Sequence, residues 1–281
     1  MACSSRLLIG ELIAKMFFER LKDIEKSLAI TMTQSFLTTR DEEILESLLY
    51  LQMKRTTTLG REYSNEIIPV AELVQRLEQS CADPSTHSAT LNIITRKLAS
   101  DKEAEDPWIE FKPHVGVCFT DKGLFYAKGI LRKHRLAERL LVELLDFPIE
   151  EAHDEACRLE HAISNQVADQ IEMKIGDEGP LYCPHGVPIP SKDGNLPRTQ
   201  FKVLSDLEAP RIVVLRGSMN EESSFLKDLR ELGLLAGTKL QLTRSNLESG
   251  NINLTLQVDN RVKEIVLPQA IASSLLVEPL E

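Results

Sequence analysis

Residues 132–145 read RKHRLAERLLVELL, and residues 150–167 read EEAHDEACRLEHAISNQV. Apolar residues recur in both stretches at the spacing of an amphipathic helix. On the first helix, His134 and Glu138 stand four residues apart and share a face. On the second, four potential metal donors at relative offsets of 0, 4, 7 and 8 occupy one arc of roughly 100°. These four donors are His153, Cys157, Glu160 and His161.

The six side chains offer imidazole, thiolate and carboxylate groups to a divalent metal. Imidazole and carboxylate suit Fe(II), Mn(II), Co(II) and Ni(II), Zn(II) is also compatible, and a thiolate disfavours Mn(II). A purely structural zinc site would usually contain more cysteines. Taken singly, each residue is more often an ordinary core or surface side chain. Together they favour a metal site, or two sites, in which the metal fixes one helix against the other.

The preceding segments predict a winged helix-turn-helix. A helical pattern over 41–53 is followed by a second helix that Pro69 opens, since proline is favourable in a first helical turn. A third helix begins near Ser85, and Ser85 or Thr86 can cap it. Residues 108–120 then predict a two-stranded ribbon with its tip at 112–114.

This order of elements predicts a DNA reader, because the second helix of a helix-turn-helix enters the major groove with its N-terminal turns. Short polar groups suit phosphates and base edges, and basic residues hold the backbone. The predicted DNA-binding residues are Ser85, Thr86, His87, Ser88, Asn92, Arg96, Lys97 and Lys112. The net charge of −10 argues against nucleic-acid binding only weakly, because a local basic surface matters more than the total.

The remaining sequence predicts one helix over 149–176, a Pro-rich linker over 179–200 and a small β-barrel from 201 onward, with a helix over 223–233. The fold class is therefore α+β. The predicted organisation is an N-terminal helical extension (1–38), a winged helix-turn-helix (39–121), metal-binding and dimerisation helices (122–178), the linker (179–200) and an SH3-like domain (201–281).

Composition limits the setting of the chain. The cysteines number five and are scattered, which does not suit a disulfide framework and favours a reducing cytoplasm. No apolar run reaches 18 residues, so no transmembrane helix is expected. We expect Cys81 and Cys118 to be buried and Trp108 to pack in the wing or core. Cys183 with His185 resembles a ligand pair, but two residues without a partner set are weak evidence.

The two quoted helices resemble the metal-binding and dimerisation region of the diphtheria toxin repressor family of iron- and manganese-dependent regulators. CPHGVPIP at 183–190 resembles that family's segment before the linker, and FTDKG at 119–123 resembles the end of its wing. LRELGLLAGTKLQL at 229–242 resembles its SH3-like module, which iron-transport accessory domains also contain. The resemblance covers most of residues 40–281 and leaves out the first 38 or so.

The resemblance implies two metal sites in each subunit. His134, Glu138 and His153 would form an ancillary site, which an acidic residue of the SH3-like module completes, and Glu221 or Glu222 is offered for that role. Cys157, Glu160 and His161 would form the activating site. The family adds a Met or Asp from the first helix of the DNA-binding domain, whereas this chain has Glu43, next to Glu42, in that neighbourhood.

The function implied is a metal-dependent repressor of metal-homeostasis genes, in which Fe²⁺ or Mn²⁺ activates operator binding by a homodimer. Zn²⁺, Co²⁺ or Ni²⁺ would serve as surrogate metals, and neither a membrane nor a small-molecule substrate is expected as a partner. Two alternatives stay open. One is a metalloenzyme that uses the same donors, although no catalytic motif accompanies them. The other is a regulator that has lost metal activation.

Overall fold

The computed structural model describes residues 37–58, 65–79, 93, 98–99, 107–176, 182–197, 201–246, 251–258 and 261–280. The chain divides into two compact units, residues 1–41 and 42–281, and each is described by itself. The first 36 residues of the predicted N-terminal helical extension, Cys81 and the start of the predicted recognition helix at Ser85 lie outside the described residues.

Helices α2 (Thr39–Thr58) and α3 (Val70–Gln79) lie where the sequence predicts the first two helices of the DNA reader. The hydroxyl of Thr38 donates to the carboxylate of Asp41 at 2.7 Å, a local bond that favours the start of a helix. Ile44 and three leucines of α2 (Leu45, Leu48 and Leu49) are fully buried, as the apolar spacing predicts. The carbonyl of Pro69 accepts the amide of Leu73, which confirms that α3 starts after this proline.

The predicted ribbon is confirmed as the antiparallel pair β1 (Ile109–Lys112) and β2 (Gly116–Phe119). Its three-residue tip includes His114 with a φ of 62°. Val117 and Ile68 exchange backbone hydrogen bonds of 2.8 and 2.9 Å, which fix the ribbon to the segment before α3. A side chain at Gly116 would lie 2.2 Å from the carbonyl oxygen of Ile68, so this close approach requires glycine.

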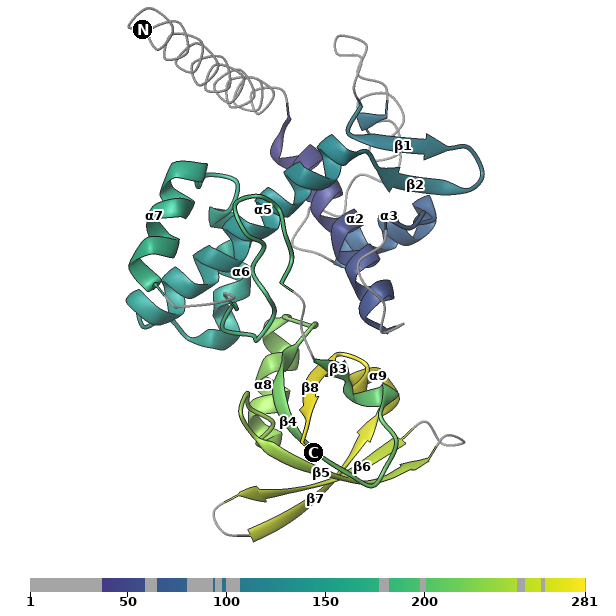
Figure 1. The fold of residues 1–281 in the computed structure, drawn as a ribbon, viewed down its shortest axis with the longest axis vertical. Helices are drawn as coiled ribbons and strands as arrows, with labels where there is room; N and C mark the ends of the chain where they lie inside the picture. Colours follow the sequence, from purple (N-terminus) through teal and green to yellow (C-terminus); the bar gives the residue numbers. More distant parts are fainter. Residues whose placement is uncertain are drawn as a thin grey trace, which may run out of the picture. The chain divides into compact units, whose positions relative to one another are not determined.

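The helical region contains α5 (Asp121–Arg139), the π-helical turn η2 (Leu140–Leu144), α6 (Ile149–Leu159) and α7 (Asn165–Ile175). Figure 1 shows α6 and α7 beside the long helix α5, which contacts both. The prediction of one helix over 149–176 is wrong. Ser164 caps α7 by accepting the amide of Val167 at 3.2 Å, so a new helix starts there.

The Pro-rich segment 182–197 is not a free linker. Its apolar residues Val187 and Ile189 pack with Leu136 of α5 and Ile171 of α7. The ammonium of Lys192 lies 2.7 Å from the carboxylate of Asp169 on α7. The carbonyl of Pro188 accepts a hydrogen bond from Arg135. The segment is therefore docked along the helices that carry the predicted metal donors.

The C-terminal region is a six-stranded antiparallel sheet with strand order β3-β8-β4-β5-β6-β7. Its strands are β3 (Lys202–Val203), β4 (Arg211–Ser218), β5 (Lys239–Asn246), β6 (Asn251–Val258), β7 (Arg261–Pro268) and β8 (Leu275–Pro279). The helical pieces are η3 (Leu204–Asp206), α8 (Ser223–Leu232) and α9 (Gln269–Ala272). Gly233, with a φ of 82°, ends α8 at the predicted position. Strands β3 and β8 are present in the structure but were not predicted from the sequence.

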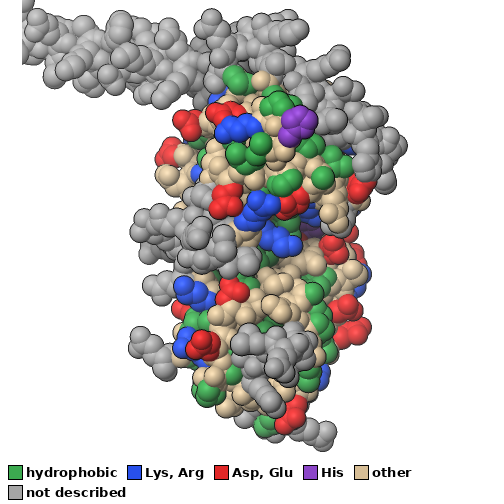
Figure 2. All heavy atoms as spheres, turned by 90° about the vertical axis from the view of Figure 1, so that its right-hand side faces the viewer, with side chains coloured by type: hydrophobic (Ala, Val, Ile, Leu, Met, Phe, Trp, Pro, Cys, Tyr) green, Lys and Arg blue, Asp and Glu red, His purple; other side chains and the backbone are tan. Residues whose placement is uncertain are grey.

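The architecture is the predicted α+β arrangement of a winged helix-turn-helix, a helical region and an SH3-like module. Trp108 and Cys118 are buried, as expected. Among the helices that the structure describes, none combines the length and the apolar character needed to cross a membrane. On the face drawn in Figure 2, basic side chains lie beside acidic ones.

Candidate metal centre

Helix α5 presents His134 and Glu138 on one buried face, with exposed fractions of 2% and 0%. The helix starts at Thr120, whose hydroxyl accepts the amide of Gly123 at 3.1 Å. Because the two residues are four apart, Nε2 of His134 lies 3.1 Å from Oε1 of Glu138. A fully buried carboxylate requires a charged partner. The site therefore begins with an imidazole and a carboxylate on one helical turn.

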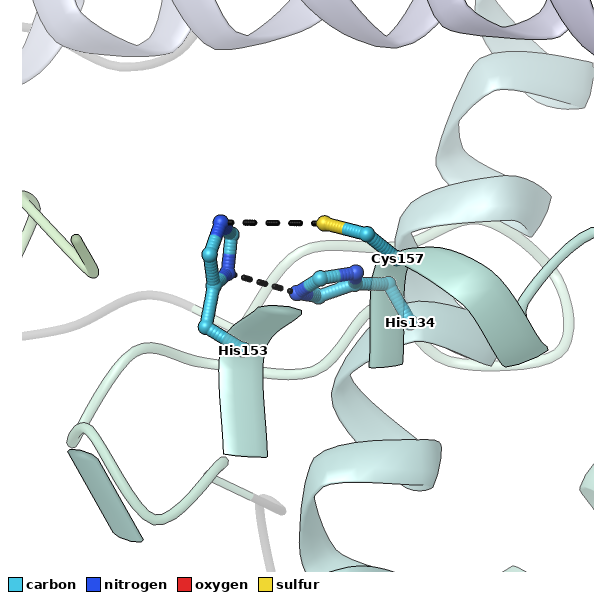
Figure 3. Close-up of side chains that lie close together, drawn as sticks. All are labelled: His134, His153 and Cys157. Carbon is cyan, nitrogen blue, oxygen red and sulfur yellow. Dashed lines mark hydrogen bonds between the residues drawn. The ribbon is translucent and has the colours of Figure 1, made fainter. Parts of the chain in front are cut away.

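Helix α6 supplies His153 and Cys157, and Glu160 and His161 follow at its C-terminal end. Nδ1 of His153 lies 3.2 Å from Nε2 of His134, and its Nε2 lies 3.7 Å from Sγ of Cys157 (Figure 3). The structure thus places Cys157 in one donor group with His134 and His153. The prediction had placed Cys157 with Glu160 and His161 instead.

We use the name ancillary group for the donors His134, Glu138, His153, Cys157, Cys183, His185 and Glu221. Two sets of four within it have all their ligand atoms within 4.8 Å of one another. Oε2 of Glu221 lies 3.4 Å from Nδ1 of His153, so the SH3-like module supplies a carboxylate at the predicted place. Glu222, the other predicted candidate, is the exposed N-cap residue of α8 and belongs to none of the donor groups found in the described residues.

Cys183 and His185 join this group, although their spacing alone was weak evidence. Nδ1 of His185 lies 3.1 Å from Oε1 of Glu138, and Sγ of Cys183 lies 4.0 Å from Oε1 of Glu221. A tight turn presents both residues, with the amide of Cys183 bonded to the carbonyl of Val187 at 2.9 Å. Their role depends on the docking of the Pro-rich segment on α5, and no local pattern in the sequence indicates that docking.

We use the name activating group for Glu42, Glu46, Glu160 and His161. Glu160 joins it to the ancillary group, because its Oε2 lies 2.6 Å from Nδ1 of His134 and its Oε1 lies 3.1 Å from Nε2 of His161. Nδ1 of His161 lies 2.6 Å from Oε2 of Glu42 on α2. The first helix of the DNA reader therefore contributes directly to the cluster.

The carboxylates that α2 brings to the cluster are Glu42 and Glu46, which stand four residues apart on one face. Glu46 forms a donor group with His134 and Glu160. Glu43, the predicted first-helix ligand, belongs to none of the donor groups found in the described residues. The spacing of four residues between Glu42 and Glu46 is the signal that could have identified both as ligands. Of the two, only Glu42 is named as a candidate from the sequence.

Burial and mutual attraction shift the pKa values of this cluster far from their ordinary positions. Burial opposes protonation of His134, but the carboxylates of Glu138 and Glu160 outweigh it and raise the pKa well above the usual value. His153 behaves likewise, since burial is overcome by Glu138 and Glu221, and its pKa rises to about 11. The neighbouring carboxylates therefore favour protonation of these imidazoles, and a metal ion would have to displace any proton that its donor nitrogens carry.

The pKa of Glu46 moves in the opposite direction from those of Glu42, Glu138 and Glu221. Burial and the neighbouring Glu160 raise the pKa of Glu46 to about 8. Burial also opposes ionisation of Glu138, yet His134 and His185 lower its pKa well below the ordinary value. A carboxyl crowded by another carboxylate is the kind of group that a cation would stabilise in its charged form.

The residues present fit a divalent transition metal. Donors on one ion with bonds of about 2.1 Å lie roughly 3 to 3.5 Å apart. The donor atoms of His134 lie 3.1 Å from Glu138 and 3.2 Å from His153, and those of His153 lie 3.6 Å from Glu138 and 3.4 Å from Glu221. Among the described residues, Oε2 of Glu138 is buried and has no hydrogen-bond partner. The mixture of imidazole, carboxylate and thiolate suits iron, zinc and cobalt and, at carboxylate-rich positions, manganese.

The predicted DNA-binding residues from Ser85 to Lys97 lie outside the described residues. Lys112 is described at the end of β1, where its side chain is half exposed and lies 3.7 Å from the carboxylate of Glu110. Its place beside the ribbon tip is compatible with a backbone contact, and its role stays a prediction.

Comparison with known proteins places the chain in a family. The family model described as "Iron dependent repressor, metal binding and dimerisation domain" matches residues 120–191. The diphtheria toxin repressor of Corynebacterium jeikeium is 30% identical over 232 residues, which cover 73% of this chain and 91% of that protein. The chain belongs to the diphtheria toxin repressor family. The iron-dependent repressor IdeR of Mycobacterium leprae is 28% identical over 224 residues, covering 74% of this chain and 87% of that protein.

Solved structures extend the comparison. ScaR with bound Zn²⁺ is 27% identical, with a TM-score of 0.64, and the match covers 84% of this chain and 99% of that one. A manganese-dependent transcriptional repressor in complex with manganese has a TM-score of 0.66 at 23% identity, covering 84% of this chain and all of that one. The latter likeness shows the fold alone. For this member of the diphtheria toxin repressor family, the resemblance inferred from the sequence is confirmed.

Proposed function

We propose that this protein is a metal-dependent transcriptional repressor that binds double-stranded DNA as a homodimer and is activated by Fe²⁺ or Mn²⁺. The observation that carries the proposal is the distance of 2.6 Å between Oε2 of Glu42 on α2 and Nδ1 of His161, which follows α6 in the chain. It joins the DNA-reading region to the metal donors of the helical region. Membership of the diphtheria toxin repressor family supports the same function.

The activating group supplies a physical route from metal to DNA. A bound cation would neutralise the crowded carboxylates Glu42, Glu46 and Glu160 and draw their donor atoms together. Two of these carboxylates belong to α2 and one to the end of α6, so the ion would fix the reader against the dimerisation helices. A fixed reader holds the recognition helices of a dimer at the half-site spacing, about one DNA turn.

The ancillary group would connect the SH3-like module to the same helices. Glu221 precedes α8 in the module, whereas Glu138 and His153 belong to α5 and α6. Metal at this group would therefore resist separation of the module from the helical region. We propose that His134, through Glu160, makes the occupancy of one group favour that of the other.

Homodimerisation is proposed through the helical region. Large apolar side chains that are 48 to 74% exposed occur there, and such surface is costly to leave in water. They are Leu144, Leu145, Val167 and Met173. All four lie within the range that matches the metal-binding and dimerisation model. Covering them by a second copy would bury apolar area in the segment that carries the metal cluster.

The test is an anaerobic selection of duplex DNA from a random-sequence library, run with EDTA and with Fe(II), Mn(II), Co(II) or Zn(II). We expect a two-fold symmetric sequence to be enriched only with metal. Anisotropy with the selected duplex should then show at least about 100-fold tighter binding with the activating ion, which corresponds to a coupling of about 3 kcal/mol. Equal affinity with and without every metal would contradict the proposal.

A further inference from the structure

Tyr126 connects the activating group to Trp108 at the base of the ribbon. It lies on α5, two helical turns before His134, and its side chain is buried. Its hydroxyl donates a hydrogen bond to Oε1 of Glu42, while Oε2 of the same carboxylate lies 2.6 Å from Nδ1 of His161. A hydroxyl bonded to a buried carboxylate is a strong, charge-assisted contact. Tyr126 therefore fixes the oxygen of Glu42 that faces away from His161.

The ring of Tyr126 packs on Trp108. The two rings meet edge to face, with centroids 5.1 Å apart and planes at 60°. Trp108 directly precedes β1, so it lies at the base of the wing. Its ring is buried and carries the ammonium of Lys122 on its face at 4.0 Å. A movement of the Tyr126 ring would therefore displace the tightly packed indole of Trp108.

The backbone of Trp108 is held as closely as its ring. Its amide donates to the carbonyl of Leu98 at 2.9 Å, and its carbonyl accepts the amide of Thr120 at 3.2 Å. A side chain at Gly123 would lie 1.8 Å from that carbonyl oxygen, so the first turn of α5 rests directly on the base of the wing. Displacement of Trp108 would therefore move the start of β1 together with the segment at Leu98.

We propose that Tyr126 is a positioning residue that transmits the state of Glu42 to the wing through Trp108. The inference rests on the metal-dependent function proposed above. Glu42 and His161 would hold the cation, and Tyr126 would keep the carboxylate in one orientation while its ring sets the position of Trp108. A tyrosine that served only as core packing would act through its ring, which phenylalanine retains. The hydroxyl separates the two roles.

The chain carries a built-in reporter for this link, because Trp108 is its single tryptophan. The experiment titrates the full-length protein with Zn(II), a closed-shell ion with no redox chemistry, and follows tryptophan emission. We expect a saturable change in the wild-type protein and loss of most of that change in Tyr126→Phe. Tyr182→Phe is the matched control, since Tyr182 packs on Phe201 in another part of the chain and should behave like wild type.

Two further readouts complete the test. Competition with a chelating dye should show Zn(II) affinity of Tyr126→Phe within about 3-fold of wild type, since the ancillary donors are intact. Anisotropy with the selected duplex should show that metal tightens DNA binding about 10-fold less than in wild type, a size within the usual range of coupling energies. Glu42→Gln provides a second variant and should also lose the emission change.

The inference is overturned if Tyr126→Phe keeps both the emission change and the wild-type coupling to DNA. It is also overturned if metal tightens DNA binding by the wild-type protein while Trp108 emission stays constant. Failure of the proposed function is a separate result, in which DNA affinity of the wild type is independent of metal. In that case, loss of the emission change in Tyr126→Phe would still support the link from Glu42 to Trp108.

Discussion

The ancillary group and the activating group are neighbours joined by the contact between His134 and Glu160, yet they are built from different parts of the chain. The ancillary group takes donors from α5, α6, the Pro-rich segment and the loop before α8. The activating group takes donors from α2 and the end of α6. The first can hold regions together, whereas the second can move the DNA reader. We infer that the ancillary group stabilises the arrangement of the helices and the SH3-like module, and that the activating group controls the position of the DNA reader.

Glu160→Gln should have the largest effect, because Glu160 contacts the histidines of both groups. The amide keeps the size of the side chain and removes the negative charge that a cation needs. Loss of a residue that only hydrogen-bonds to a metal ligand typically weakens metal binding by 10 to 100-fold. Loss of Glu160, which is itself a donor, should therefore weaken metal binding at least about 100-fold. Calorimetry with Mn(II) and Co(II) measures the effect.

Glu155→Gln is the matched control, since Glu155 lies on α6 and pairs with Arg158 on the surface. It should leave metal affinity unchanged. If Glu160→Gln weakened only one of two resolved binding events, the two groups would be independent rather than joined through this carboxylate.

Replacing the donors of the Pro-rich segment should separate the groups. The double variant Cys183→Ser, His185→Ala removes two ancillary donors and leaves α2 untouched. We expect affinity at the ancillary group to fall roughly 10 to 100-fold, whereas metal-dependent DNA binding should persist at higher metal concentration. The absorption of bound Co(II) reports the thiolate, and anisotropy reports DNA binding. Complete loss of metal-dependent DNA binding would contradict the assignment of separate roles.

The two groups also differ in how far the sequence predicts them. The donors on α5 and α6 share helical spacings, so one helix pattern brings His134, Glu138, His153 and Cys157 into view. Cys183 and His185 depend on how an irregular segment docks, which is a tertiary property without a local signal. Glu46 shares a helical face with Glu42, but the approach of this face to Glu160 and His161 depends on how α2 packs, which is a tertiary property without a local signal.

The fold shows the same division. Periodicity and turn residues predict α5, the ribbon, α8 and strands β4 to β7, because each has a strong local pattern. The break between α6 and α7 depends on one serine cap within an otherwise helical pattern. Strand β3 has two residues and is defined by its pairing with β8, so no run of residues indicates it.

The pH dependence of stability should distinguish the metal-free cluster from the metal-bound one. The pKa of His153 is about 11 in the folded protein against 6.5 in an ordinary histidine, so its stabilisation is complete below pH 6.5 and disappears as pH rises toward 11. The raised pKa of Glu46, about 8, acts in the same direction between pH 4.5 and 8. The EDTA-treated protein should therefore have a Tm lower by roughly 5 °C or more at pH 9 than at pH 6.5.

Metal should reverse this trend, because protons leave the donors when it binds and its affinity rises with pH. The gain in Tm on adding Mn(II) should accordingly be larger at pH 8.5 than at pH 6.5, as scanning calorimetry can measure. His114→Gln at the exposed ribbon tip is the control and should keep both trends. A metal-free protein whose Tm rises over this range would show that protonated histidines do not stabilise the cluster.

The smallest expected effect concerns the surface contacts between α8 and α6. These contacts help to hold Glu221, which directly precedes α8, next to the ancillary donors. Arg230 pairs with Glu150, Lys227 lies 3.6 Å from Glu151, and the hydroxyl of Ser223 donates to Asp154 at 3.0 Å. Arg230 is more than half exposed, so solvent screens the pair, and Arg230→Gln should cost about 0.5 kcal/mol or less. Chemical denaturation at low and high NaCl measures this cost, which should vanish at high salt.

Lys239→Gln, at the start of β5 and away from α6, is the matched control for the loss of one positive charge. Because the ancillary group needs Glu221 in place, Arg230→Gln should also weaken Mn(II) binding there slightly, by about 2-fold at low salt, and leave the activating group unaffected. If instead DNA binding changed more than ancillary affinity did, the position of the SH3-like module would act directly on the DNA reader. The division between a stabilising ancillary group and a controlling activating group would then have to be abandoned.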